Sequence, residues 1–130
     1  MKNLFFAFAL FLASPALASE IDFTRHILDL DGKDIPVSAD KDAPITTLAR
    51  VAETALLNEP PVDPRQPVAA ETPDQKRQRF DLALRIYQAK GAVTLSSEEV
   101  TLVKNAIAAI YGPLVVGRAA EILDPVPAKP

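Results

Sequence analysis

The sequence predicts an α+β fold in which an N-terminal β-hairpin packs with three or four short helices. Three observations support this fold class: an Asp31-Gly32 turn signal lies between apolar runs, capping boxes open two amphipathic segments, and prolines separate the segments. The chain has 130 residues, enough for one domain. We expect a signal peptide over 1–18 and a single small domain over 19–124.

The N-terminal stretch has the three-part pattern of a signal peptide. Lys2 supplies a positive charge, Leu4 to Leu12 form an unbroken apolar run, and Ala16 to Ala18 match the small-x-small cleavage pattern. Cleavage is predicted between Ala18 and Ser19. The run is shorter than the roughly 20 residues that span a bilayer. No stable membrane anchor is therefore expected after cleavage, and the mature protein is expected to be periplasmic or secreted.

The segment Ile21 to Val37 is predicted to form the hairpin, with a bulge near Arg25-His26 and a two-residue turn at Asp31-Gly32. A type I′ turn needs positive φ at both central residues, which Asp and Gly tolerate. This register pairs Leu28 with Ile35, and both are expected on the face that Leu30 also shares.

The turn sequence DLDGKD, residues 29–34, also resembles part of a calcium loop, because it holds three carboxylates in six residues. An EF-hand with Gly32 at its sixth position would have Ile27 at its first and Ser38 at its twelfth. Two oxygen ligands would then be missing, and calcium needs six or more. The stretch is therefore predicted to be a turn, and no metal site is expected.

A first helix is predicted from Ala43 to Asn58, with Asp42 as its N-cap. A proline-rich linker follows over 59–71. Its prolines have the three-residue period of a polyproline II helix, so a docking segment and a plain spacer both stay open. The apolar stripe of the helix is expected at Leu48, Val51, Ala52, Ala55 and Leu56.

A second helix is predicted to begin with a capping box formed by Thr72 and Gln75, with Pro73 in the first turn. Gly91 is expected to end it as a left-handed residue. Its apolar stripe, which should face the core, is expected at Phe80, Ala83, Leu84 and Tyr87, widened by Ile86.

A third helix is predicted from a capping box formed by Ser96 and Glu99, and a fourth over Leu114 to Leu123. The fourth is apolar on more than one side, which indicates burial in the core or in a homo-oligomer. A flexible tail is expected over 125–130. The core stripe of the third helix is expected at Val100, Val103, Ile107 and Ile110. The candidate interaction surface on the fourth comprises Leu114, Val115, Val116 and Ile122.

The residue types exclude several kinds of site. Cysteine is absent, which excludes thiolate chemistry, and His26 is the single histidine, which excludes zinc sites built from two or three. The chain contains no G-x-S-x-G, P-loop or dinucleotide-binding motif. Glu98 and Glu99 are explained by helix capping and by the helix dipole. We therefore predict no catalytic residue and no cofactor; an enzyme using carboxylates alone is the alternative.

The charge pattern argues against nucleic-acid binding. The formal net charge is −3, so no basic field surrounds the chain. Lys76, Arg77 and Arg79 form a small basic cluster without interleaved aromatic residues, which is typical of a solvated helix face.

Three stretches, "IDFTRHILDLDGKDIPV", "RFDLALRIYQAKGAVTLSSEEVTLVKNAI" and "YGPLVVGRAAEIL", carry a family resemblance. Over Ile21 to Leu123 the chain resembles a group of small uncharacterised proteins of tailed phages and prophages. The resemblance implies an accessory protein that binds a host or virion protein in the cytoplasm, and it implies no site residues. The export signal and the proline-rich linker depart from that group. The leading expectation is a small exported, non-enzymatic interaction protein of unknown partner.

Overall fold

The computed structural model describes residues 18–59, 63–65 and 71–124, and within them the predicted α+β architecture is confirmed. The signal-peptide residues before Ala18, most of the proline-rich linker and the tail lie outside the described residues. The described part contains a two-stranded antiparallel sheet and four helices. The strands are β1 (Ala18–Asp22) and β2 (Ala92–Ser96), and the helices are α2 (Leu48–Leu57), α3 (Pro73–Gln88), α4 (Ser97–Ile110) and α5 (Pro113–Leu123).

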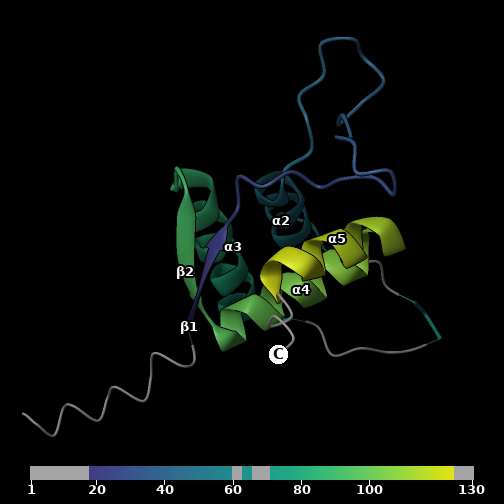
Figure 1. The fold of residues 1–130 in the computed structure, drawn as a ribbon. Helices are drawn as coiled ribbons and strands as arrows, with labels where there is room; N and C mark the ends of the chain where they lie inside the picture. Colours follow the sequence, from purple (N-terminus) through teal and green to yellow (C-terminus); the bar gives the residue numbers. More distant parts are fainter. Residues whose placement is uncertain (1–17, 60–62, 66–70, 125–130) are drawn as a thin grey trace, which may run out of the picture.

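The sheet joins two segments that are far apart in the sequence. β1 runs antiparallel to β2 in a register that pairs Ala18 with Ser96 and Asp22 with Ala92 (Figure 1). Period-two alternation in β2 buries Val93 and Leu95. The sequence had placed β1 in a local hairpin and had not indicated β2, because five residues carry too short an alternation. The sheet therefore forms by long-range pairing.

The hairpin after β1 has a three-residue loop instead of the predicted two-residue turn. The amide of Gly32, whose φ is +81°, donates to the Asp29 carbonyl at 3.1 Å, and the Asp29 amide donates to the Lys33 carbonyl at 2.9 Å. Leu28 consequently pairs with Asp34. A slip of one residue moves side chains to the opposite face. The predicted register is thus wrong: Ile27 is buried, whereas Leu30 is 86% exposed.

The connection between β1 and the hairpin also differs from the prediction. In place of a bulge, a turn follows the strand, and the Arg25 amide donates to the Asp22 carbonyl at 3.4 Å. The Asp22 carboxylate accepts from the Thr24 amide at 2.9 Å, which stabilises the turn locally. The turn leaves Phe23 and Ile27 buried.

Helix α2 begins at Leu48, later than the predicted start at Ala43. The intervening residues are extended: the Thr46 amide donates to the Ile35 carbonyl at 2.8 Å, and its carbonyl accepts from Ile27 at 3.0 Å. β-Branched residues favour such pairing over a helical turn. Thr47 therefore replaces Asp42 as N-cap and accepts from Arg50. The predicted stripe is confirmed, since Leu48, Val51, Ala52, Ala55 and Leu56 are all buried.

Both predicted capping boxes are present. The Thr72 hydroxyl accepts from the Gln75 amide at 3.1 Å, and the Gln75 side chain accepts from the Thr72 amide at 2.9 Å. The corresponding distances between Ser96 and Glu99 are 3.1 and 2.9 Å. These reciprocal bonds satisfy amides that a helix start leaves unpaired.

Helix α3 ends without the predicted left-handed glycine. Its C-cap, Ala89, has an extended conformation with φ −75° and ψ 143°, and its amide donates to the Arg85 carbonyl at 3.1 Å. Gly91 instead belongs to the short connection into β2.

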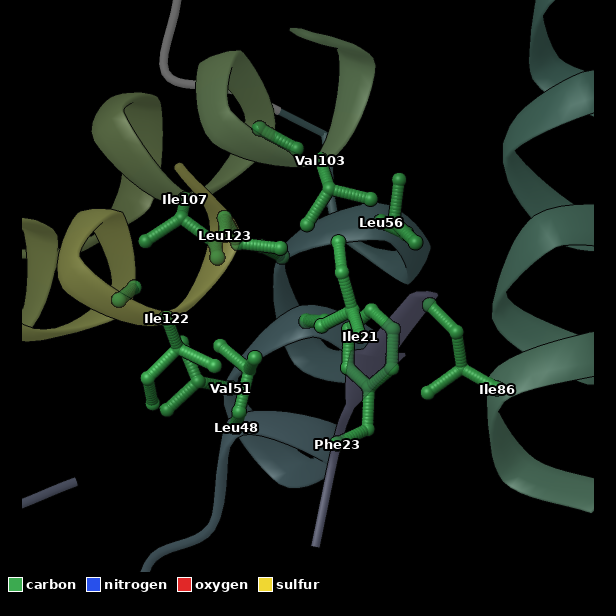
Figure 2. Close-up of a cluster of buried hydrophobic side chains, with 14 of the residues drawn as sticks. Ile21, Phe23, Leu48, Val51, Leu56, Ile86, Val103, Ile107, Ile122 and Leu123 are labelled. Carbon is green, nitrogen blue, oxygen red and sulfur yellow. The ribbon is translucent and has the colours of Figure 1, made fainter. Parts of the chain in front are cut away.

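One core connects both strands with the four described helices. Figure 2 shows Ile21 and Phe23 at its centre, with Ile86 of α3 on one side and Ile122 of α5 on the other. Of the four α4 residues predicted as its core stripe, Val103 and Ile107 are buried, while Val100 and Ile110 are partly buried and pack against the core.

Helix α5 also holds the hairpin. Arg118 donates from Nη2 to the Asp29 carbonyl at 2.7 Å and from Nε to the Leu28 carbonyl at 3.2 Å. The same guanidinium contacts Glu121 at 3.2 Å. In Figure 1 the blue segment that joins β1 to α2 passes α5 and then projects away from the helices. Arg118 thus fixes the base of this projection.

Candidate functional site

A stripe of large apolar side chains lies exposed along α3. Phe80, Leu84 and Tyr87 are 53%, 38% and 72% exposed and follow the i, i+4, i+7 spacing of one helix side. We call these three residues the α3 stripe. The sequence had predicted them as core residues, which is wrong, although Ala83 and Ile86 of the same prediction are buried. Contiguous apolar surface of this kind marks interaction sites more often than scattered exposed residues do.

The orientation of α3 follows from a buried arginine. Arg79 lies on the side that packs against α2, where its Nη2 donates to the carbonyls of Ala55 and Asn58 at 3.0 and 2.5 Å. Its Nε donates to the Leu56 carbonyl at 3.0 Å, and Nη1 contacts Glu71 at 3.0 Å. Arg79 therefore caps the C-terminal end of α2. The prediction that it belongs to a solvated basic face is wrong.

This contact explains why α3 presents its stripe outward. The side chains of Arg79, Leu82, Ala83 and Ile86 form the buried side of the helix. Two apolar stripes therefore lie on one helix, and the one beside Arg79 faces the core. Hydrophobic spacing alone does not distinguish them, because both have helical period. The signal that could have separated them is Arg79, whose charge the carbonyl end of α2 attracts.

A groove of about 760 Å³ separates α3 from the first half of α4. Asp81 lines the groove and lies three residues before Leu84, so it borders the α3 stripe, whereas the other groove residues of α3 lie on a different side of the helix from the stripe. Leu82 and Leu102 contribute apolar surface to its lining. The other lining residues are polar: Gln78, Asp81, Arg85, Ser96, Glu98, Glu99, Thr101 and Asn105.

The groove is held together by Arg85. Its Nη1 contacts the Glu99 carboxylate at 2.5 Å, and its Nη2 donates to the Thr94 carbonyl of β2 at 2.9 Å. Partial burial tends to raise the pKa of Glu99, but hydrogen bonds from the Ser96 backbone and from Arg85 outweigh it and hold that pKa below its ordinary value. Three carboxylates with one guanidinium leave the groove an excess of negative charge.

The interaction surface predicted on α5 is mostly internal. Ile122 is buried, and Val115 and Val116 pack against the core at partial exposure. Leu114 is the exposed member of the set. The apolar character of α5 was expected to reflect burial in the core or in a homo-oligomer, and the structure shows burial in the core. Ile122 is therefore a core residue, not a surface residue.

The remaining predicted residues do not line the groove, although Ala18 pairs with Ser96, which does. Ala18 and Ser19 are the first residues of β1. In the turn that contains Asp31 and Gly32, the Asp29 carboxylate accepts the amides of Asp31 and Lys33 at 2.8 and 3.0 Å. The Asp29 carboxylate, one of the three that resemble calcium ligands, thus accepts hydrogen bonds within the turn itself.

Within 18–59, 63–65 and 71–124, no group of three or more His, Asp or Glu side chains is placed to hold a metal ion. In the same part of the chain, no helix combines the length and apolar character needed to cross a membrane. Comparison with protein-family models, with curated proteins and with solved structures found no match for the chain.

Proposed function

We propose that the protein is a small exported, non-enzymatic interaction module that docks a helical segment of a partner protein along α3. The observation that carries the proposal is the α3 stripe, whose three large apolar side chains stay exposed although the core is complete without them. Amphipathic helices commonly bind through anchors at i, i+4 and i+7. The stripe offers the matching spacing on this chain.

The α3 stripe alone is smaller than one side of a standard interface. Large aromatic side chains bury about 150–250 Å² each, so the exposed parts of the stripe offer roughly 300 Å². A stable interface needs about 800 Å² from each partner. A partner therefore needs further contact area beyond the stripe. Asp81 borders the stripe beside Leu84, and its negative charge favours a basic side chain on that flank of the partner.

The chemistry of the groove supports a binding role. Glu99 is held as a carboxylate by Arg85 and by the capping box, whereas a general acid needs a raised pKa. Arg85 also links α3 to the Thr94 carbonyl of β2, so its charged group already has its partners in place. Groups that are ordered before binding lose less entropy on binding.

Export is proposed from the sequence pattern before Ser19. Cleavage there removes one of the five strand pairs and leaves four, Ser19 to Asp22, together with the core residues Ile21 and Phe23. The domain therefore keeps its packing without the signal segment. The alternative, an accessory protein that binds a host or virion protein in the cytoplasm, requires that the segment before Ser19 is not cleaved.

The test compares captured partners for the wild type, the stripe variant Phe80→Ser/Tyr87→Ser and the control Leu30→Ser, whose residue is exposed at the hairpin tip. Each tagged chain is purified from the native envelope fraction. A partner retained by wild type and control but lost from the stripe variant supports the proposal. Equal capture by all three contradicts it.

Three further measurements use the same preparation. Circular dichroism checks that the stripe variant keeps its fold, which is expected because both residues are exposed. The N-terminal peptide in mass spectrometry should start at Ser19, and an intact Met1 in the only detectable pool contradicts export. Light scattering over a range of concentrations should show a monomer; a dimer lost in the stripe variant would make a second copy the occupant.

A further inference from the structure

The bond predicted for cleavage lies inside the β1–β2 ladder. Ala18 pairs with Ser96, and Ser19 pairs with Leu95. The side chains of Ala18 and Ser19 are exposed, but their main chain belongs to the paired strand. The position of β1 thus places the scissile amide where a protease must compete with β2.

Neighbouring contacts hold β1 in place. Ile21 and Phe23 are buried in the core, and Leu95, which pairs with Ser19, is buried on β2. Ser96 is fixed in turn by its capping box with Glu99. Opening β1 beyond its first residues therefore also removes Ile21 and Phe23 from the core.

Proteases bind their substrates as extended strands through main-chain hydrogen bonds, and β2 already occupies the main-chain groups along one edge of β1. A folded chain is cut only from its opened state. We infer that the Ala18–Ser19 bond is hydrolysed only while β1 is detached from β2, so that processing precedes closure of the sheet. This inference rests on the proposed export, and it makes β1 a strap that closes after processing.

The chemical step is an ordinary amide hydrolysis. One water molecule adds across the bond, which leaves a carboxylate on Ala18 and an ammonium group on Ser19. The shortened strand keeps its pairs from Ser19 to Asp22 and can then close on β2. A precursor that folds before it meets the peptidase keeps its leader.

A disulfide across the ladder tests this order of events. Glu20 and Thr94 are register partners with exposed side chains. Paired residues of an antiparallel ladder lie about 4.5–5.5 Å apart, within disulfide range. The natural chain has no cysteine, so Glu20→Cys/Thr94→Cys introduces a single pair. Oxidation locks β1 onto β2, and reduction releases it in the same protein.

The full-length precursor is incubated in detergent micelles with purified type I signal peptidase. We expect the oxidised double variant to be cleaved at least tenfold more slowly than its reduced form, and wild-type precursor refolded beforehand to be cleaved more slowly than precursor diluted from urea. Equal rates for locked and reduced protein overturn the inference and leave export untouched. Failure to cleave the urea-diluted precursor after Ala18 overturns the export proposal, and this inference with it.

Discussion

Replacing Arg79 by alanine should destabilise the protein strongly. The substitution removes three hydrogen bonds to the C-terminal carbonyls of α2 and the ion pair with Glu71. Hydrogen bonds to a charged group contribute about 1.5–3 kcal/mol each. Asn58 is exposed, so water can replace part of this loss. Breaking a buried charged pair costs about 3–5 kcal/mol, and we expect Arg79→Ala to lower the unfolding free energy by about 3 kcal/mol.

Urea denaturation followed by circular dichroism measures this change, and the melting temperature should fall by roughly 12 °C or more. Arg77→Ala is the matched control, because its side chain is 82% exposed and lies 4.0 Å from Asp81; its cost should stay below about 0.5 kcal/mol. Arg79→Lys should fall between them, since an ammonium lacks the planar fork of donors. Equal stabilities for Arg79→Ala and Arg77→Ala would refute the capping argument.

Three further predictions concern backbone conformation, capping and pH. An added Cβ meets no atom within 4 Å at Gly32 or at Gly117, so only backbone conformation distinguishes the two sites. Gly32→Ala should lower the unfolding free energy by about 1 kcal/mol, because its φ is +81°, whereas Gly117→Ala, inside α5, should raise it by about 0.5–1 kcal/mol. Melting temperatures that shift in the same direction for both variants would contradict this. Ser96→Ala should lower the unfolding free energy by about 1 kcal/mol and the exposed control Ser97→Ala by much less, measured in urea. The folded-state pKa of Glu99 is depressed, so its contribution is present above the unfolded value of about 4.3 and is lost as pH falls through the folded pKa. Melting temperatures of Glu99→Gln should therefore converge with wild type only in acid; a constant difference down to pH 2 would count against it.

Local sequence signals predicted the helices best. Both capping boxes, the stripe of α2 and the stretch of α5 agree with the structure, because the interactions that define them span three or four residues. The start of α2 was wrong for a tertiary reason. Pairing of Thr46 with two other segments competes with helix formation there.

The candidate site could be predicted only in part. The apolar character and helical spacing of Phe80, Leu84 and Tyr87 are visible in the sequence, but their exposure is not. It follows from the contact of Arg79 with α2, which joins residues 21 to 24 positions apart. The groove likewise joins residues of α3, β2 and α4, which Arg85 links through Thr94 and Glu99.

Caps and prolines set the starts of α3, α4 and α5, and they are readable locally since they act on the backbone within one turn. Which side of each element is buried, and which strand β1 joins, depends on tertiary contacts. Burial depends on the surface that each element meets, and those partners come from distant parts of the chain. Arg118 illustrates the reason: its bonds to the hairpin carbonyls join residues 89 and 90 positions apart, a contact that no local pattern records.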